Sequence, residues 1–463
     1  MLNIQELQIQ NNWWKNKKYK IPEINWPKRD LFYILKEDLK NSLILNTIGL
    51  RRTGKSSILK QLIIYLLNKK INPQNIFYFL FDNSSQIKTT EFLDDILKLY
   101  LTEVQQNTVS NLNEKIYIFL DEIQYIDNWQ SVLKKYYDLS NKKIKFIITG
   151  SQSILLKEKA RESLAGRIFD YYLPPLSFRE FLLINKNKNF ENFENFDLFD
   201  LPKIFFKLSN YKLDYGQKVF DLSKDYITYG QFPETNQLAT DKNKQIYIME
   251  SILGKILEDC VKVYKIEKEN EFKLIAYYLL NNISSIFEIK NIGQTIGLSK
   301  ITLEKYVTYL KSANFFEILF KYHKSLIQRG RISKKIYTTS VNFNCALNYY
   351  QKKHITKTPQ VFGKIIENLV FNILKQKYHN LNLSFYRQGN KEIDFVLVDN
   401  NNYLPIEVKF SDNISLGDLK TIIKYLYLKK QAYGIVVTKN KLDKRKIEDK
   451  IIYFIPYYLL LFL

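Results

Sequence analysis

Apolar runs alternate with helical periodicity along the first part of the chain. Between Leu43 and Tyr172, short apolar segments are separated by stretches with the spacing of amphipathic helices. Strands buried on both faces of a parallel sheet are continuous apolar runs of this kind. The pattern predicts an α/β fold with a parallel sheet, whose candidate strands are residues 42–49, 75–82, 115–122, 144–151 and 167–174.

The middle of the chain has a different pattern. Residues 185–208 are rich in Asn, Lys and Phe, and we interpret them as an insertion or a loosely ordered loop between helices. Residues 215–285 are periodic and predicted to be mostly helical. Residues 288–320 predict two short helices joined at "GLS", with Ser299 as the N-cap of the second, followed by a strand. Two helices and a hairpin follow the plan of a winged helix, with residues 323–335 as its wing.

A separate α/β unit is predicted from about residue 357 onward, with a helix at 360–378, a hairpin, another helix and a final strand. The terminal apolar run, residues 451–463, contains Pro456 and is too short to span a bilayer, so we interpret it as a closing buried strand. The predicted domains are a helical extension (1–40), an α/β core (41–175), a helical lid with the low-complexity insertion (176–265), a winged helix (266–350) and a C-terminal α/β domain (355–463).

Length, charge and cysteine content favour a multidomain protein with an acidic partner and without structural disulfides. The length of 463 residues exceeds what one hydrophobic core supports, and the net charge of +23 indicates an acidic partner such as nucleic acid. Abundant Lys, Asn, Ile and Tyr are also typical of an AT-rich genome, which is a competing explanation for the charge. Two cysteines form neither a disulfide framework nor a zinc site, and the N-terminus lacks a secretory segment. We expect a soluble, cytoplasmic protein without a membrane segment.

A phosphate-binding motif follows the first candidate strand. Gly49, Gly54, Lys55 and Ser56 satisfy the pattern G-x-x-x-x-G-K-[ST] between a strand and an amphipathic helix. Backbone N–H groups would surround the phosphates, Lys55 would reach the β- and γ-phosphates, and Ser56 would bind Mg²⁺. The predicted ATP-binding residues of this loop are Gly49, Leu50, Arg51, Arg52, Thr53, Gly54, Lys55, Ser56 and Ser57.

A pair of acids ends the third candidate strand. In "IYIFLDEIQ", Asp121 would hold Mg²⁺ through water, and Glu122 could polarise the attacking water. This pair indicates hydrolysis and disfavours a small-molecule kinase.

The chain order of the strands predicts where this pair lies. A whole strand, residues 75–82, separates the two motifs, so the strand at 144–151 is expected between them, as in the additional-strand ATPases. Thr149 and Ser151 would then lie beside the γ-phosphate as sensors. Arg161 or Arg167 could act as an arginine finger, in cis or from a neighbouring subunit of a homo-oligomer.

Five segments together resemble the AAA-type ATP-binding proteins common in archaea and bacteria: "GLRRTGKS", "FLDEIQYIDNW", "ITGSQSILL", "SLAGRIFDYYLPPLSFREFL" and "YGQFPE". The resemblance covers nearly the whole chain. It implies that a winged helix and a restriction-nuclease-like domain follow the ATPase. The family usually has an acidic "Y-x-x-D" after the winged helix, whereas Ser340 occupies that place here, which weakens any role of the linking segment.

A second candidate site lies in "EIDFVLVDNNNYLPIEVKF". If Val398 pairs with Tyr403 across the turn, Asp394 lies opposite Glu407, and Lys409 lies on the same face. Opposed carboxylates roughly 5 Å apart repel and favour a divalent cation between them. Asp followed by Glu-x-Lys is the PD-(D/E)xK nuclease pattern, in which the lysine positions or activates water. Glu367 matches the additional helical acid of that fold, which gives Glu367, Asp394 and Glu407 as metal ligands.

Two functions are therefore open. The first is a Mg²⁺-dependent ATPase that acts on or near DNA and carries a nuclease-like domain. The second is an ATP-operated switch or scaffold whose nuclease fold binds nucleic acid or protein without cutting. Divalent-dependent cleavage would separate the two.

Overall fold

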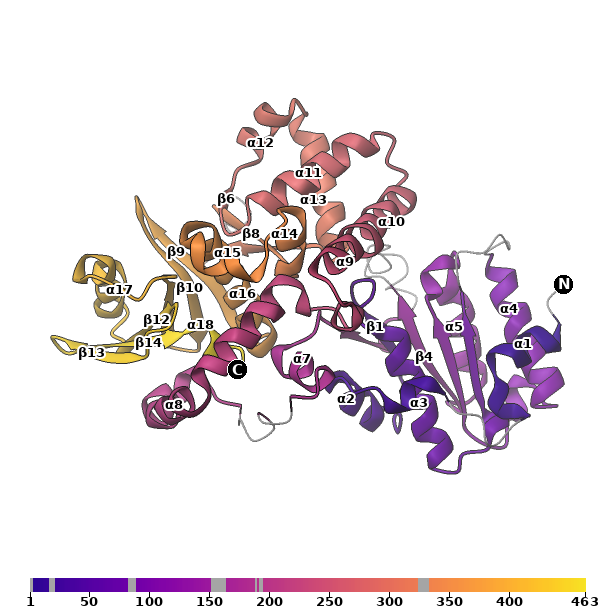
Figure 1. Ribbon diagram of the computed structural model, residues 1–463. Coiled ribbons are helices and arrows are strands. Elements are labelled where there is room, and N and C mark those ends of the chain that lie inside the picture. Colours follow the sequence, from indigo (N-terminus) through magenta and orange to yellow (C-terminus); the bar gives the residue numbers. More distant parts are fainter. Residues whose placement is uncertain are drawn as a thin grey trace. The chain divides into compact units, whose positions relative to one another are not determined.

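The computed structural model describes residues 3–15, 21–81, 89–150, 164–187, 190, 195–323 and 333–463. They form two compact units, Met1–Pro174 and Pro175–Leu463. The first is coloured indigo to purple and the second magenta to yellow in Figure 1. No helix of the described part is long and apolar enough to cross a membrane. The finer domain boundaries within the two units stay predictions.

The N-terminal unit is built on a parallel sheet. Its strands are β1 (Ile44–Ile48), β2 (Ile76–Leu80), β3 (Ile116–Asp121), β4 (Ile144–Gly150) and β5 (Ile168–Tyr172). Their order is β2-β3-β4-β1-β5, and all neighbours are parallel. The sheet is typical of the P-loop AAA fold, which confirms the predicted fold class. β4 lies between β1 and β3, as the chain order predicted.

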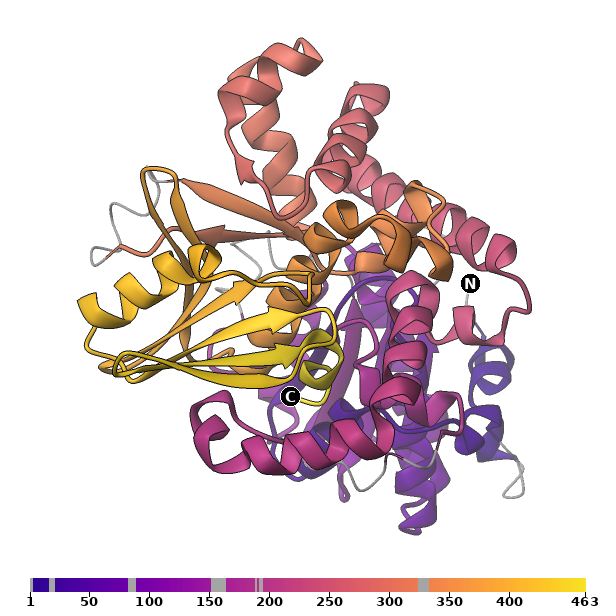
Figure 2. The same ribbon diagram turned by 60° about the vertical axis from the view of Figure 1, so that its left-hand side comes forward.

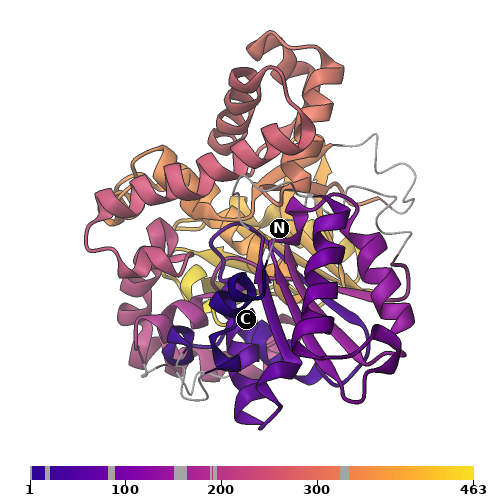
Figure 3. The same ribbon diagram turned by 90° about the vertical axis from the view of Figure 1, so that its right-hand side faces the viewer.

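Helices cover both faces of this sheet (Figure 3). On one face lie α2 (Asp30–Asp38) and α3 (Lys55–Asn68), and on the other α1 (Ile4–Gln10), α4 (Thr90–Leu99) and α5 (Trp129–Leu139). Successive strand residues alternate between the two cores: Phe77 packs with the second group of helices and Tyr78 with the first. Because both faces are buried, the strands are apolar runs rather than alternating patterns.

Side chains of the N-terminal segment cover the edge strand β2. The side chain of Asn11 replaces the hydrogen bonds of a neighbouring strand. Its NH₂ group donates to the carbonyl of Tyr78 at 2.9 Å, and its oxygen accepts from the N–H of Tyr78 at 2.7 Å. The indole groups of Trp13 and Trp14 both donate to the carbonyl of Ile76. These bonds occupy backbone groups that an open sheet edge would expose to another chain.

The C-terminal unit contains a six-stranded sheet. Its strands are β9 (Asn382–Gln388), β10 (Lys391–Asp399), β11 (Asn402–Val408), β12 (Tyr433–Thr438), β13 (Asp443–Ile447) and β14 (Lys450–Pro456). Their order is β13-β14-β12-β11-β10-β9, with β11–β12 and β12–β14 parallel and the other pairs antiparallel. Helix α16 (Pro359–Lys377) packs on one face and α17 (Leu416–Leu428) on the other. Figure 2 shows this sheet in orange and yellow.

A small antiparallel sheet precedes it in the chain. It consists of β6 (Ile286–Phe287), β7 (Phe316–Phe320) and β8 (Lys334–Thr338), in the order β6-β8-β7. Three helices accompany it: α11 (Glu269–Asn281), α12 (Ile289–Ile296) and α13 (Lys300–Ser312). Ser299 caps α13, since its hydroxyl accepts from the N–H of Thr302 at 3.2 Å. Most of the predicted wing, residues 324–332, lies outside the described residues.

Further helices complete the C-terminal unit. They are α7 (Phe178–Ile184), α8 (Leu201–Asp225), α9 (Asp241–Ile246), α10 (Lys255–Tyr264), α14 (Val341–Leu347), α15 (Lys352–Lys357) and α18 (Tyr457–Leu460). Two π-helical segments extend this series, at Tyr226–Gly230 and Tyr247–Gly254.

The sequence predicts an insertion or a loosely ordered loop at residues 185–208, and the structure corrects the second alternative for residues 195–208. From residue 195 onward this stretch is packed, with Phe196, Leu198 and Leu201 buried in the main core of the unit. The backbone of Leu198 donates to the hydroxyl of Tyr378 at 2.8 Å and accepts from that of Tyr433 at 3.0 Å. Its apolar residues pack against residues that are far away in the sequence, and local composition does not reveal such contacts.

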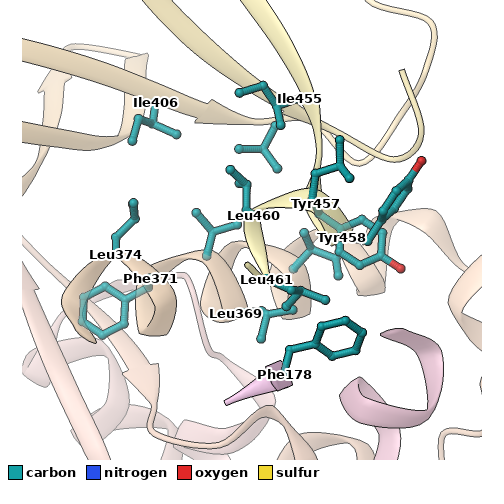
Figure 4. Packing of buried hydrophobic residues seen from close by; sticks show 14 of the residues in the cluster. Phe178, Leu369, Phe371, Leu374, Ile406, Ile455, Tyr457, Tyr458, Leu460 and Leu461 are labelled. Carbon is teal, nitrogen blue, oxygen red and sulfur yellow. The ribbon is translucent and has the colours of Figure 1, made fainter. Parts of the chain in front are cut away.

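The terminal apolar run is also not a single strand. β14 ends at Pro456, and the short helix α18 follows. Its residues are buried, and Figure 4 shows Leu461 close to Leu369 of α16. The run is apolar throughout because both the strand and the helix lie in the core, so hydrophobicity alone could not distinguish the two conformations.

A buried lysine makes the stability of the N-terminal unit depend on pH. Lys145 on β4 has no exposed surface and donates to the side-chain oxygen of Asn41 at 2.8 Å. Burial, with a smaller contribution from the charge of Lys115, lowers the pKa of Lys145 to about 7. Above that pH the unfolded chain binds a proton that the folded protein has released, so stability rises as the pH increases toward the normal lysine pKa.

We therefore predict that the difference in unfolding free energy between wild type and Lys145→Met changes between pH 7 and pH 9. As the pH rises, the unfolding free energy of the wild type should increase relative to that of Lys145→Met, by up to about 1.4 kcal/mol per pH unit. Denaturant unfolding of the full chain at several pH values measures this difference, with the exposed Lys142→Met as the control. A difference that does not vary with pH would contradict the assignment.

Candidate nucleotide site and C-terminal carboxylate cluster

The phosphate loop connects the end of β1 to the start of α3. A Cβ atom at Gly49 would lie 2.4 Å from the carbonyl oxygen of Leu173, so any side chain there would require the backbone to move. Gly54 has a φ of 97°, in the left-handed region that favours glycine. Helix α3 begins at Lys55, and its first N–H groups have no partner within the helix. The loop thus has the geometry of an anion site at a helix N-terminus.

The Lys55 side chain lies against this loop. It is 4% exposed, and its ammonium group donates to the carbonyls of Leu50 at 3.0 Å and Gly49 at 3.3 Å. The same group lies 3.9 Å from a carboxylate oxygen of Glu122. The lysine therefore connects the loop to the acid pair at the end of β3. The other predicted loop residues are Leu50, Arg51, Arg52, Thr53, Ser56 and Ser57.

Asp121 is the buried acid at the end of β3. One carboxylate oxygen accepts from the hydroxyl of Thr149, and the other accepts from Tyr78 at 2.9 Å. Burial and the charge of Glu122 raise the pKa of Asp121 above its usual value, while hydrogen bonds from Thr149, Ser56 and Tyr78 oppose the shift. Ser56 and Asp121 thus come together, and a hydroxyl beside a carboxylate is the all-oxygen donor set that Mg²⁺ prefers.

Glu122 has an unusual backbone conformation. Its φ of 56° lies in the left-handed region, which costs a non-glycine residue about 1–3 kcal/mol. Its N–H donates to the hydroxyl of Thr149 at 2.9 Å, and its carboxylate accepts from the side chain of Gln124. Burial acts to raise the pKa of Glu122, but the charge of Lys55 and the bond from Gln124 outweigh it and hold the pKa below its usual value. The carboxylate is therefore ionised and fixed in place.

Two residues of this site have no signal in the sequence. Tyr78 lies in an ordinary apolar strand, and only the register of β2 against β3 brings its hydroxyl to Asp121. Arg29 precedes α2 and is 5% exposed. Its guanidinium donates to the carbonyl of Thr53 in the phosphate loop at 2.6 Å and to that of Pro174 at 2.9 Å. No motif indicates an arginine at that distance from the loop in the chain.

The structure corrects the assignment of Arg167 as a finger for its own site. Arg167 immediately precedes β5, and its carbonyl accepts from Ile44 at the start of β1. The phosphate loop follows the opposite end of β1. The Arg167 guanidinium forms a bidentate ion pair with the carboxylate of Asp138, with nitrogen–oxygen distances of 2.9 and 3.2 Å. A contribution from Arg167 to a neighbouring subunit stays a prediction, and Arg161 and Ser151 lie outside the described residues.

The hairpin of the second candidate site has the predicted register. Val398 pairs with Tyr403, and the pairing continues to Phe395 and Ile406. Asp394 follows on one strand, and its carboxylate accepts from the N–H of Val408 at 2.9 Å. The predicted acids therefore do converge on one side of the β10–β11 hairpin.

A lysine from another sheet lies among these acids. Lys335 on β8 is 2.9 Å from Glu367, 2.6 Å from Glu392 and 3.0 Å from Asp394, and its side chain is 3% exposed. Burial would lower the pKa of Lys335, but the charges of Asp394, Glu367 and Glu392 raise it above its usual value. We name these residues, together with Glu407, the carboxylate cluster. Neither Lys335 nor Glu392 was predicted from the sequence to be part of this site.

The remaining members of the predicted set form a second pair. Glu407 and Lys409 are 2.8 Å apart, and the other oxygen of Glu407 is buried without a hydrogen-bond partner. Burial and the charge of Asp394 raise the pKa of Glu407 to about 8, and the same two causes raise that of Glu367 to about 8.

The predicted metal site is not formed at this cluster. In the described part of the chain, no three His, Cys, Asp or Glu side chains are placed to hold a metal ion. The physical reason is that the Lys335 ammonium group lies between the acids that the sequence assigned to a metal.

Models of protein families match three parts of the chain. One, described as an AAA domain, matches residues 41–182. Two domains of unknown function, DUF8612 and DUF4143, match residues 221–353 and 362–460. The AAA domain includes the phosphate loop and the acid pair, whereas the other two matches do not identify a winged helix or a nuclease.

The chain is also similar to whole proteins. "Uncharacterized protein MJ1637" of Methanocaldococcus jannaschii is 30% identical over 446 residues, covering 92% of this chain and 87% of that protein. MJ1544 of the same organism is 27% identical over 384 residues, covering 80% and 76%. Among solved structures, the Walker-type ATPase PABY2304 of Pyrococcus abyssi has 16% identity and a TM-score of 0.45, covering 73% of this chain and 99% of that one.

The AAA domain match agrees with the parallel sheet and the phosphate loop built above. The identity to MJ1637 extends over most of both proteins. The chain therefore belongs to the same protein family as MJ1637, and its residues 41–182 match an AAA domain.

Proposed function

We propose that the protein is a Mg²⁺-dependent ATPase that acts on or near DNA. The observation that carries the ATPase proposal is the convergence of Lys55, Asp121, Glu122 and Thr149 at the carboxyl edge of one sheet. Nucleotide-binding sites of α/β sheets form where parallel strands end. The AAA domain match supports the same conclusion.

Each residue has a role that its surroundings support. Lys55 and the N–H groups of the loop bind the β- and γ-phosphates. Ser56 and Asp121 hold Mg²⁺, which when bound supplies positive charge to the phosphate oxygens. Glu122, ionised by its positive neighbours, accepts a proton from the attacking water. Thr149 fixes the end of β3, because its hydroxyl accepts from the backbone N–H of Glu122 and donates to the carboxylate of Asp121.

The DNA proposal rests on the helices and small sheet between residues 269 and 338. The order of helices and strands there supports a winged helix, and α13 would be its recognition helix. Lys300, Lys305 and Lys311 are exposed on α13, and Ile301 is 78% exposed. Exposed lysines on one helix suit contacts to phosphate groups.

A second function, the ATP-operated switch, is favoured by one observation. Lys335 lies between Glu367 and Asp394, two of the acids that the nuclease resemblance assigns to a metal ion. A nuclease fold with a lysine in that position supports binding without cutting. In that case ATP hydrolysis would set the conformation of the protein and the C-terminal domain would hold a partner.

We predict that two substitutions separate nucleotide binding from hydrolysis. Lys55→Ala should lose affinity for ATP, because the substitution removes the ammonium group that contacts the negatively charged β- and γ-phosphates. Glu122→Gln should bind ATP but hydrolyse it at least about 100-fold more slowly, because the amide cannot accept the proton. Binding of a fluorescent ATP analogue and phosphate release measure the two steps, with the exposed Glu103→Gln as a matched control. Unchanged hydrolysis by Glu122→Gln would reject its assignment as the base.

We also predict that α13 carries affinity for DNA. Replacing Lys300, Lys305 and Lys311 by alanine should weaken duplex binding and reduce the slope of log affinity against log salt by up to about 3. The control replaces three exposed lysines elsewhere in the same unit, Lys203, Lys242 and Lys268. Equal losses in both triple variants would mean that the charge acts diffusely, as the AT-rich composition suggests.

A further inference from the structure

The carboxylate cluster already contains a cation that belongs to the chain. Lys335 comes from β8, Glu367 from α16, and Glu392 and Asp394 from β10. The three nitrogen–oxygen distances are 2.6–3.0 Å, and a lysine ammonium group has three hydrogens to donate. Three acceptors therefore satisfy the ammonium group completely, which a lysine that is 97% buried requires.

The bonds around Lys335 use the oxygens that a metal ion would need. The oxygen of Glu367 that contacts Lys335 also accepts from the hydroxyl of Tyr337 at 2.8 Å. Asp394 gives one oxygen to Lys335 and the other to the N–H of Val408. A divalent ion bound by the same oxygens would lie within a few ångströms of the ammonium group, and the two cations would repel. The cluster cannot hold both at once.

We propose that Lys335 is the resident cation of the carboxylate cluster and keeps it closed to divalent metal ions. The residues around the cluster do not fit the metal site that the nuclease resemblance implies, unless Lys335 withdraws. This inference is independent of ATP hydrolysis, because every residue in it lies in the C-terminal unit.

The strand that supplies Lys335 is attached to α16 at three nearby positions. Beyond Lys335 itself, Tyr337 bonds to Glu367, and the backbone of Thr338 exchanges two bonds with the side chain of Asn368, at 2.8 and 2.7 Å. These bonds hold the backbone of β8 against α16, so the Lys335 side chain extends to the acids from a fixed position.

The first experiment uses the nucleotide-free wild-type protein and Mn²⁺, followed by electron paramagnetic resonance. We predict no Mn²⁺ site that depends on Asp394, so wild type and Asp394→Asn should bind equal amounts. We also predict no divalent-dependent cleavage of single-stranded or duplex DNA. Mn²⁺ binding or DNA cleavage that Asp394→Asn abolishes would overturn the proposal, and this test does not require any Lys335 variant to fold.

The second experiment removes the resident cation. Lys335→Ala should gain one Mn²⁺ site, and Mn²⁺ should raise its melting temperature but not that of the wild type. Lys334→Ala, a change at the adjacent strand position, should behave as the wild type does. Adding Asp394→Asn to Lys335→Ala should remove the gained site. A folded Lys335→Ala protein that binds no Mn²⁺ would also overturn the proposal.

A separate observation concerns the phosphate loop. Arg29 bridges the loop at Thr53 to the backbone at Pro174, and the neighbouring carbonyl of Leu173 is the atom against which Gly49 packs. Both ends of the loop are thus held against the segment that follows β5. We infer that Arg29 is a positioning residue that fixes the loop before nucleotide binds. This second inference rests on the proposed ATPase function.

Substitution of Arg29 tests this role. Arg29→Ala should raise the Kd for ATP and the KM about tenfold or more, with a smaller change in kcat, because the loop and not the acid pair is released. Arg29→Lys should recover part of the affinity, since lysine can reach one of the two carbonyls. ATP affinity of Arg29→Ala equal to that of the wild type would overturn the inference.

The binding and hydrolysis measurements distinguish a failure of the proposed ATPase function from a failure of the inference about Arg29. A wild-type protein that binds but does not hydrolyse ATP would reject the proposed function and leave the role of Arg29 open to the binding assay. If Arg29→Ala does not fold, the affinity of Arg29→Lys decides, and wild-type affinity in that variant would reject the need for two bonds.

Discussion

The pairing of buried charge is the constraint on which both candidate sites depend. An isolated ionised group in a protein interior costs several kcal/mol unless a partner compensates for it. In the N-terminal unit, β1, β3 and β4 are buried on both faces, so the acid pair lies where β3 ends and the buried Lys145 lies near the other end of β4. Lys55, Asp121 and Glu122 meet there and are held by Thr149 and Tyr78. The loop and the acid pair therefore form one electrostatic unit.

The C-terminal unit satisfies the same constraint in another way. Four acids converge at one end of the β10–β11 hairpin and α16, where like charges repel. A nuclease would compensate for them with a metal ion that exchanges with solvent. Here a lysine from a neighbouring sheet lies among them. The compensating cation is part of the chain, so it does not exchange with solvent as a bound metal ion does.

This contrast suggests how the two units differ in function. The nucleotide site has Ser56 and Asp121 side by side, which suits a cation that arrives with ATP and leaves with the product. The carboxylate cluster has its cation fixed in the chain, which suits a site whose state changes with conformation. A family resemblance alone could not separate these cases, because both clusters present acids at motif positions.

The arrangement of the candidate nucleotide site was largely predictable from the sequence. Gly49, Lys55, Asp121 and Thr149 occupy local motifs at strand ends, and parallel strands bring their carboxyl ends to one edge. The register of the β10–β11 hairpin was equally predictable, because a short turn determines which residues pair. The conformation of residues 195–208 was not, since their core partners are distant in the chain.

The sequence by itself therefore determined the parallel sheet, the phosphate loop, the acid pair and the convergence of Asp394 with Glu407. Only the tertiary structure decided which cations neutralise the acids. Lys335 is 59 residues from Asp394 in the chain, and Arg29 is 24 residues from Thr53, and neither lies in a motif. The physical reason is that strand ends and hairpin registers are local or periodic properties, whereas the partner of a buried charge is whichever side chain the packing brings within about 3 Å.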